Sequence, residues 1–516
     1  MTSQFTITTA IDYTNAGPHI GHAYEKILAD VIARFQRLRQ REVLFITGVD
    51  QHGQKVKQAA EKQGISSQEF ADSVTLKFTA LWDALEISYE RWAATTDPIH
   101  KRVVSKILQR LYEAGDLYKS THSGFYSIRQ EQFLTDKDRN EAGDFGPEWG
   151  EVIFLEEDNW YFRLTSHLPW LLRFVERHPE FVLPGFRQAE LINAIQRGGQ
   201  DLCISRPKSR LSWGIELPFD SEFVTYVWFD ALINYISFAG YLADDPQEEK
   251  KFWDRWPALH VIGKDIMVPA HAIYWPIMLH AMAFSDEQIP RLLVHGWWNC
   301  KGMKVSKSLG NAVDPVQLAS QYGSSALRYY FVRDIATGQD ADFSEERLVM
   351  LYNSELANGV GNLLNRVLNM THRYLGGTIR SECEFPEGNT LARENRSLVE
   401  QYFTYMEAFE INLAIETINK IATHSNAFIE KCAPWLLAKD PAQKERLENV
   451  LRVLCESVWL IANLLAPILP RESAAMLRQL NTKPFSFTER NMFLPLPLEV
   501  GQPTPVFPRI ESEKSN

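Results

Sequence analysis

A short motif near the start of the chain carries side chains suited to phosphate chemistry. Residues 19–22 read His-Ile-Gly-His, follow Pro18, and precede a stretch with apolar residues at helical spacing. A helix start offers free backbone N–H groups to phosphate, Gly21 allows close approach of a nucleotide, and two imidazoles can donate to phosphate oxygens. The alternative is that His19 and His22 only cap the helix or pack there. The motif favours an ATP site that includes His19, Gly21 and His22.

A second motif lies almost 300 residues later, and its chemistry complements the first. Residues 301–310 read Lys-Gly-Met-Lys-Val-Ser-Lys-Ser-Leu-Gly, so Lys304 and Lys307 lie in a short loop between two glycines. A lysine is a compact charge on a flexible stem and can stabilise a departing pyrophosphate. A solvated basic loop is the alternative for this motif by itself. The two motifs in this order, around an α/β insertion, are more specific than either alone.

The elements around the first motif predict a parallel α/β sheet. Residues 5–9 are rich in β-formers, 12–19 contain Asn, Gly and Pro, and 23–40 have helical spacing. A second buried strand is expected at 43–47, followed by a helix at 54–62. Alternation of strand and helix is typical of a parallel sheet.

The middle of the chain predicts an insertion, after which the sheet resumes. Between 118 and 222 the pattern becomes irregular, with acidic loops and a basic group at Arg206, Lys208 and Arg210 that could steer nucleic acid or be a solvated loop. Strands and helices are expected to return at 223–229, 260–262, 231–241 and 271–284.

The last third predicts an all-helical bundle with a tail. Amphipathic patterns run over 351–374, 391–428 and 444–480, and residues 501–516 contain three prolines and a charged end. The apolar stretch 453–470 is interrupted by Glu456, Asn463 and Pro467, which favours a core helix over a membrane span.

Composition limits the class of protein. At 516 residues, with 45% hydrophobic and 23% charged residues, the chain is expected to fold throughout into two to four domains. The N-terminus has no basic segment followed by an apolar run, so a cytoplasmic protein without membrane contact is expected. The net charge of -11 means that any RNA must meet local basic patches. The five cysteines form no CxxC pair, which argues against a disulfide framework and a cysteine zinc site.

Together the two motifs resemble the HIGH and KMSKS signatures of class I aminoacyl-tRNA synthetases, with Val305 where Met is usual. Stretches 8–13, 48–53, 226–231, 263–266 and 271–276 are similar to the methionyl-tRNA synthetase family, and the resemblance runs from about residue 5 to 490.

The resemblance implies a Rossmann-like catalytic domain with an inserted connective-peptide domain, followed by an all-α anticodon-binding bundle. We expect the first catalytic half at 1–117, the insertion at 118–222, the second half at 223–295, a KMSKS-loop linking region at 296–345, the bundle at 346–490 and a tail at 491–516. Residues 126–133 lack cysteine where many relatives hold zinc, so a metal-free knuckle is implied and no structural zinc is expected. The short insertion also argues against the large editing domain of the leucine, isoleucine and valine enzymes.

The implied reaction joins methionine to ATP and then to tRNA. The methionine carboxylate attacks the α-phosphorus in line and expels pyrophosphate, with Mg²⁺ on the phosphates, so positioning and fixed positive charge should dominate catalysis. By resemblance, the catalytic and ATP-binding residues are His19, Gly21, His22, Lys304 and Lys307, with Asp265 as a further ATP contact at the ribose.

The resemblance also assigns a methionine site, with Asp50 on the substrate's α-amino group. Asp50 alone could equally be the N-cap of the following helix. An aromatic-lined pocket suits the polarizable methionine side chain. The stretch between Ile266 and His271 is one residue longer than the family pattern. The implied set is Ala10, Ile11, Tyr13, Asp50, Trp228, Tyr235 and His271.

For tRNA, the resemblance implies anticodon contacts by Asn362, Arg366 and Trp435. Asn362 and Arg366 share a helix face, and Trp435 follows Pro434 at a helix start, where it can stack on an unpaired base. The partners implied are initiator and elongator methionine tRNA, and a monomer is expected. Another class I synthetase, a silent tRNA-binding paralogue and a nucleotidyltransferase without tRNA remain as alternatives.

Overall fold

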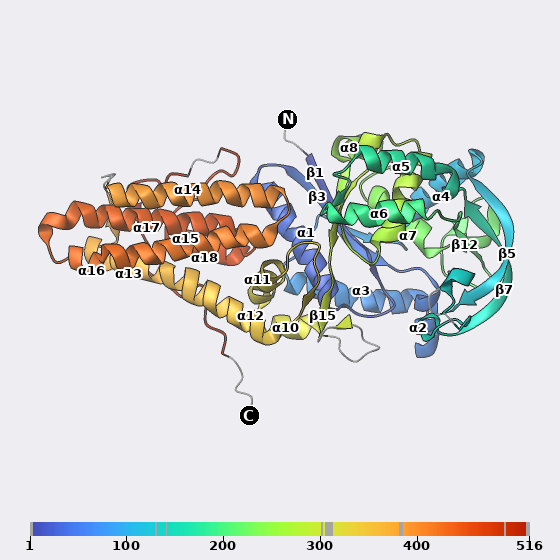
Figure 1. The fold of residues 1–516 in the computed structure, drawn as a ribbon, viewed down its shortest axis with the longest axis horizontal. Coiled ribbons are helices and arrows are strands. Elements are labelled where there is room, and N and C mark those ends of the chain that lie inside the picture. The colour runs from blue at the N-terminus through green and yellow to red at the C-terminus, as the bar shows by residue number, and fades with distance from the viewer. Residues whose placement is uncertain are drawn as a thin grey trace, which may run out of the picture.

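The computed structural model describes residues 4–128, 132–140, 142–300, 303–304, 313–380, 385–489 and 492–511. An α/β part with a central parallel sheet and a helical bundle lie end to end along the long axis of the molecule (Figure 1). This confirms the predicted fold class.

The central sheet has the strand order β4-β3-β1-β13-β14-β8, with β2 continuing beside β3 after β1 ends. Every pairing in it is parallel. The chain leaves β1 towards β3 on one side and leaves β13 towards β14 on the other, so β1 and β13 flank the point where ligands bind in open α/β sheets. The strands are β1 (Gln4–Thr9), β2 (Asp12–Tyr13), β3 (Glu42–Asp50), β4 (Arg91–Ala94), β8 (Val182–Leu183), β13 (Ala258–Gly263) and β14 (Arg291–His295).

Helix α1 (Ile20–Leu38) lies between the sheet and the bundle (Figure 1). Most of its residues are buried, because one face packs on the sheet and Phe35 contacts Tyr402, Phe403 and Phe487 of the bundle side. The other helices of the α/β part are α2 (Gln54–Gln63), α3 (Ser67–Ala84), α4 (Pro98–Glu113), α7 (Val227–Ser237), α8 (Pro246–Arg255), η4 (Met267–Tyr274) and α9 (Trp275–Ala281).

The region 118–222 is more regular than its sequence indicated. Strands β5 (Leu117–Ser127) and β7 (Val152–Phe162) pair antiparallel over their whole length. Their exposed residues include apolar ones such as Phe125, Ile153 and Phe154, which obscures the alternation on which strand prediction depends. The rest of this region comprises β6 (Gln132–Leu134), β9 (Leu202–Cys203), β10 (Ser205–Pro207), β11 (Glu216–Leu217), β12 (Asp220–Thr225), α5 (Leu168–Arg177) and α6 (Phe186–Gln196).

The observed bounds of three elements differ from those expected from the sequence. The strand expected over 223–229 ends at Thr225, and α7 begins at Val227. The helix expected over 391–428 is two helices, α14 (Pro386–Glu407) and α15 (Ile411–Cys432), joined by a tight turn in which Phe409 has a φ of 61°. The pattern over 444–480 is α17 (Lys444–Leu465) and α18 (Pro470–Gln479), because Pro467 and Pro470 interrupt it.

The bundle consists of α13 to α18, preceded by a connecting region of short elements. That region and the remaining part of the bundle comprise β15 (Trp298–Cys300), β16 (Met303–Lys304), α10 (Pro315–Tyr322), α11 (Ser324–Asp334), β17 (Ala341–Asp342), α12 (Glu345–Leu351), η7 (Tyr352–Gly361), α13 (Asn362–Leu375), β18 (Thr378–Ile379) and α16 (Pro434–Leu437). The C-terminal segment packs back on this part of the chain: β19 (Leu498–Glu499) pairs with β18, and Phe507 is buried.

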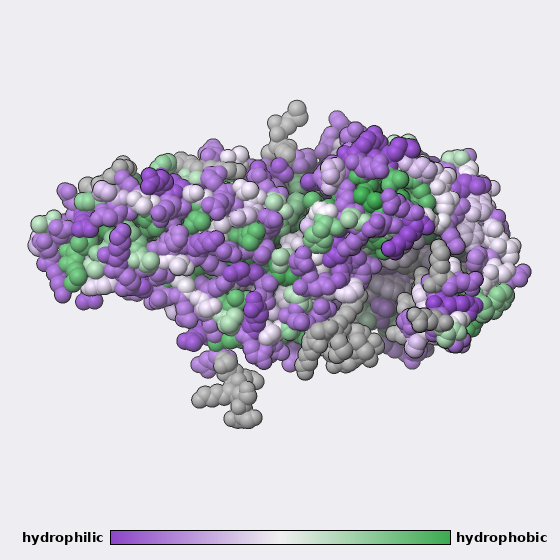
Figure 2. Space-filling model, in the orientation of Figure 1, coloured by the Kyte–Doolittle hydropathy of each residue, from purple (hydrophilic) through white to green (hydrophobic). Residues whose placement is uncertain are grey.

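The visible surface is largely hydrophilic, with hydrophobic residues gathered both at the end of the bundle farthest from the sheet and in a patch on the α/β part (Figure 2). Helix α16 lies at that end (Figure 1). Among the helices that the structure describes, none has the length and apolar character needed to cross a membrane.

Candidate active site

A cavity of about 370 Å³ opens at the carboxyl ends of β1, β3, β13 and β14. It brings together eleven residues that the sequence singled out: Ala10, Ile11, Tyr13, His19, Gly21, His22, Asp50, Trp228, Tyr235, Asp265 and His271. The sequence did not single out the other lining residues: Asp12, Glu25, Ala231, Leu232, Asn234, Gly263, Ile266, His295, Gly296, Trp297 and Trp298.

The two histidines of the first motif form the start of α1. His19 is the N-cap, and its Nδ1 accepts a hydrogen bond of 3.1 Å from the Gly21 N–H. The His22 Nδ1 accepts from the His19 N–H at 3.1 Å, and the two rings stack with centroids 3.8 Å apart. Since both Nδ1 atoms are acceptors, the neutral rings carry their protons on Nε2. The histidines therefore cap the helix and line the cavity at the same time.

Asp50 is the last residue of β3 and lines the cavity, and its carboxylate accepts two hydrogen bonds from the protein. Its Oδ1 accepts from the His52 N–H at 3.2 Å and from Thr95 Oγ1 at 3.3 Å. Helix α2 is instead capped by Gly53, without a side-chain hydrogen bond, so Asp50 is not its N-cap. A buried carboxylate facing the cavity can bind a cationic group of a ligand.

His271 lines the cavity despite the extra residue in front of it. It belongs to η4, a kinked π-helix in which Val268 has an extended backbone (φ -113°, ψ 127°). The His271 Nδ1–H donates to the Ile266 carbonyl at 2.8 Å, so its Nε2 accepts from the Tyr235 hydroxyl at 2.7 Å. Burial lowers the pKa of His271 to about 4, which keeps the ring neutral at pH 7.

The wall behind Tyr235 is also neutral and aromatic. The His260 ring stacks on Tyr235 with centroids 4.2 Å apart and accepts at Nε2 from the Trp275 indole N–H at 3.0 Å. Burial holds the pKa of His260 well below its usual value. Trp228 faces His271 edge-on. This side of the cavity suits an apolar, polarizable side chain better than a charged one.

A buried lysine connects two sides of the cavity. The Lys26 ammonium donates to the Ala10 carbonyl at 3.0 Å, to Asp12 at 2.7 Å and to Glu25 at 2.9 Å. The other Glu25 oxygen lies 3.0 Å from Nε2 of His295. Burial raises the pKa of Asp12 to about 7, although Lys26 acts in the opposite direction. The sequence signal for this network was a Glu-Lys pair flanked by apolar residues in α1, and sequence analysis passed over it.

The lysine motif lies mostly outside the described residues. Lys307 is one of the undescribed residues, and for Lys304 the structure gives only its place at the end of β16. Trp297 and Trp298, which precede the motif, line the cavity. Of the chain just before this motif, the cavity wall thus includes residues up to Trp298, six positions before Lys304.

Of the residues expected to contact the anticodon, Asn362 and Arg366 lie on α13 and Trp435 lies on α16. Arg366 on α13 donates to Asn426 at 3.2 Å and forms an ion pair with Glu430 at 2.6 Å. Glu430 lies in the last turn of α15, just before α16, where the Trp435 residue is 37% exposed. Asn362 begins α13 and lies one turn before Arg366.

The three basic side chains singled out in the inserted region all have partners within the protein. Arg206 is buried, with its guanidinium 3.8 Å from the centre of the Tyr226 ring. Lys208 pairs with Glu216 at 2.7 Å, and Arg210 pairs with Glu157 at 3.1 Å. Within the described ranges, no cluster of three or more His, Cys, Asp or Glu side chains could hold a metal ion.

A parallel sheet with a helix N-terminus and a cavity at its switch point defines a nucleotide-binding α/β enzyme of the class I synthetase type. The family model described as "tRNA synthetases class I (M)" matches residues 5–141 and 150–368. The model described as "Anticodon binding domain of methionyl tRNA ligase" matches residues 382–516. The chain belongs to the methionine family of class I tRNA synthetases.

Relatives are similar over almost the full chain. The methionine–tRNA ligase of Fusobacterium nucleatum is 39% identical over 100% of this chain and 81% of its own length. That of Nostoc sp. is 39% identical over 99% of this chain and 98% of its own. Mycobacterium tuberculosis methionyl-tRNA synthetase in complex with methionyl-adenylate superposes with a TM-score of 0.91 and 36% identity, covering 99% of this chain and 100% of that one.

Proposed function

We infer that this chain activates methionine with ATP to methionyl-adenylate and pyrophosphate, and then transfers methionine to the 3′ end of its tRNA. The observation that supports this best is the cavity itself. There the start of α1, suited to phosphate, meets the Asp50 carboxylate and the neutral aromatic wall of Tyr235 and His271.

The methionine end of the site is proposed around Asp50. Its carboxylate accepts from the substrate ammonium, while Ala10, Ile11 and Tyr13 form the adjacent edge. The thioether lies against Trp228 and the Tyr235–His271 pair, where sulfur–aromatic contacts contribute about 0.3–1.5 kcal/mol each. Discrimination against a ligand that differs by one methylene is then limited to about 1–3 kcal/mol.

The ATP end is proposed at the start of α1. The substrate carboxylate attacks the α-phosphorus in line, so the protein has to hold two reactants in position and stabilise charge on the leaving pyrophosphate. His19 and His22 donate from Nε2, Gly21 leaves room at the helix start, Asp265 binds the ribose, and Lys304 and Lys307 contact the pyrophosphate. ATP enters with Mg²⁺ on its phosphates, which supplies further positive charge.

For tRNA, we propose that Trp435 stacks on an unpaired anticodon base while Asn362 and Arg366 bond base edges. Both initiator and elongator methionine tRNAs share the anticodon that such a site reads, so both are proposed substrates. We also propose that the protein acts as a monomer in the cytoplasm, where translation uses the product.

The test is pyrophosphate exchange into ATP, measured with each of the twenty amino acids separately. Exchange should depend on methionine and fall by about 100-fold or more in Lys307→Ala, since one such donor contributes about 3 kcal/mol. Lys420→Ala, which removes a half-exposed lysine of the bundle, is the control and should leave exchange unchanged. Exchange that depends on another amino acid would show that this amino acid, and not methionine, is the substrate. No exchange at all would favour a silent tRNA-binding protein.

A further inference from the structure

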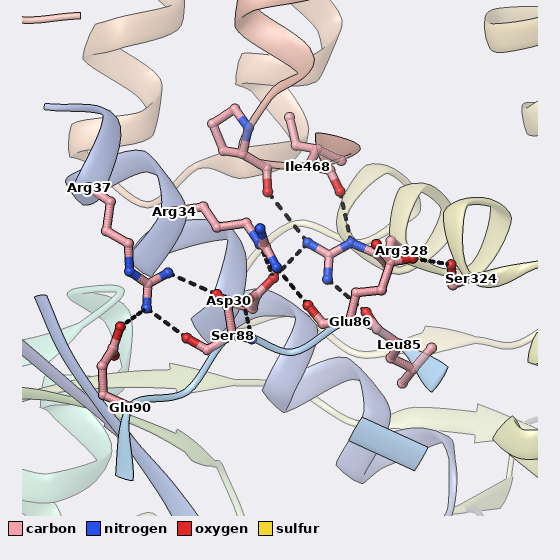
Figure 3. A network of polar contacts seen from close by, with 11 residues as sticks. Asp30, Arg34, Arg37, Leu85, Glu86, Ser88, Glu90, Ser324, Arg328 and Ile468 are labelled. Carbon is pink, nitrogen blue, oxygen red and sulfur yellow. Dashed lines mark hydrogen bonds and ion pairs between the residues drawn. The ribbon is translucent and has the colours of Figure 1, made fainter. Parts of the chain in front are cut away.

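Arg328 is a buried arginine on α11, away from the cavity. Its side chain is 1% exposed, and its planar fork donates in three directions. Nε donates to the Ile468 carbonyl at 2.8 Å, Nη1 to the Leu85 carbonyl at 3.0 Å, and Nη2 to Asp30 Oδ2 at 2.7 Å. Figure 3 shows these contacts converging on one guanidinium.

The three partners belong to three different parts of the molecule. Asp30 lies in α1, eight residues after His22. Leu85 caps the C-terminus of α3, and Ile468 lies in the turn between α17 and α18 of the bundle. Helix α11 itself follows the lysine motif. Arg328 therefore joins the helix that begins at the ATP end of the cavity to the bundle that carries the residues expected to contact the anticodon.

The Asp30 carboxylate is fixed independently of Arg328. Its oxygens also accept from Arg34 Nε at 2.7 Å and from the backbone N–H and the hydroxyl of Ser88 at 2.8 Å and 2.6 Å (Figure 3). Loss of the Arg328 fork would thus leave Asp30 with charged and polar partners. The groups that would lose a donor are the Leu85 and Ile468 carbonyls, together with the Pro467 carbonyl, which accepts from Nη2 at 3.4 Å.

A second set of contacts surrounds this junction. Arg471 of α18 pairs with Glu86 and donates to Ser324 at 2.7 Å. Ser325 donates to Glu472 at 2.5 Å. The Arg471 side chain is 65% exposed, so these outer bonds are weaker than the buried fork.

Apolar contacts alone would keep the bundle against α1 but would not fix the angle between the bundle and this helix. Phe35 packs among Tyr402, Phe403 and Phe487, and such contact is favourable but non-directional. Hydrogen bonds of a buried polar group add direction to such a contact, because each bond has a required geometry. Arg328 supplies such bonds to three separate parts of the molecule across this junction.

We propose that Arg328 is a positioning residue for tRNA charging: it fixes the bundle at the angle to α1 at which one tRNA reaches the anticodon site and the cavity together. This rests on the anticodon reading proposed above. Two sites bind one ligand together only when their spacing matches it, and a misplacement of about 1 Å can cost about 100-fold in rate.

The test is Arg328→Lys, which keeps a charge beside Asp30 but removes the planar fork. Three quantities are measured on the full chain: methionine-dependent pyrophosphate exchange, binding of an isolated anticodon stem–loop by fluorescence anisotropy, and kcat/KM for charging the whole tRNA. We expect the first two to stay within about two-fold and the third to fall by about ten-fold or more. Arg333→Lys, on the same helix but paired with Glu355, is the control and should change none of them.

Arg471→Ala removes an outer contact at an exposed position, and it is the second test of the proposal if Arg328→Lys does not fold. It should show the same pattern with a smaller loss of charging. Unchanged charging in both variants overturns the proposal. A fall in exchange by the same factor as charging also overturns the proposal, because the effect then lies in the α/β part alone. Loss of stem–loop binding overturns it as well, because the effect then lies in the bundle alone. Failure of the unmodified chain to bind the stem–loop would instead refute the proposed anticodon reading.

Discussion

The ring of His19 lies directly against Gly21. A Cβ atom at position 21 would be 3.0 Å from Cε1 and 3.1 Å from Nδ1 of that ring. Gly21→Ala should favour the helix by up to about 1 kcal/mol through propensity while displacing the imidazole. We expect exchange to fall by about ten-fold or more with an unchanged or higher melting temperature. Equal exchange in the variant would show that the orientation of His19 does not matter to the reaction.

The hydrogen bond from Tyr235 to His271 predicts a change confined to methionine. Tyr235→Phe keeps the ring and removes a bond worth about 0.5–1.5 kcal/mol, so KM for methionine should rise by about 2- to 13-fold. KM for ATP should not change, because the hydroxyl bonds His271 at the proposed methionine end of the cavity. Tyr274→Phe on η4 is the control. A fall in stability without a change in either KM would mean that this hydrogen bond stabilises the fold but does not contribute to methionine binding.

Buried neutral histidines predict that the protein loses stability in acid. Burial lowers the pKa of His100 from 6.5 to about 4. Between these values the unfolded chain binds more protons, so the free energy of unfolding falls as pH falls through this window. From pH 7 to pH 5 this histidine should account for about 2 kcal/mol.

Urea unfolding of the unmodified chain and of His100→Asn at the two pH values measures this share. The variant should lose about 2 kcal/mol less than the unmodified chain over the same interval. His260 and His271 remain in both proteins and should keep part of the slope. Identical slopes would mean that His100 is not held neutral in the folded state.

Trp435 predicts an effect on tRNA alone. Stacking on one base contributes about 1–3 kcal/mol, so Trp435→Ala should raise KM for tRNA by about 5- to 150-fold. Exchange without tRNA should not change. Leu436→Ala, which removes an exposed neighbour on the same short helix, is the matched control. A loss of exchange in the tryptophan variant would contradict a role limited to tRNA.

The central fold followed from the sequence where local patterns agree with the packing. The apolar runs that became β1, β3 and β13, and the helical spacing of α1, predicted a parallel sheet with its ligands at the strand ends. The break at Phe409 was missed because a non-glycine residue adopts positive φ there, without a Gly or Pro to mark it. The helical start at Val227 was missed because its aromatic residues also favour strands.

The cavity was predictable only where a motif marked its residues. The sequence placed Asp50, Tyr235 and His271 together through family resemblance. Neither Lys26 nor Arg328 belongs to a motif, and the burial of a charged side chain depends on carbonyls and carboxylates brought by distant segments. The spatial convergence of these partners is a property of the packed chain.

Helix α1 has consequences for how the protein could evade an inhibitor. Its buried residues extend from Ile20 to Gln36, so most positions along it face either the sheet or the bundle. A substitution in such surroundings typically costs about 1–3 kcal/mol, a large share of the stability of a folded protein. A compound anchored on the start of α1 would therefore contact a surface with few viable escape mutations.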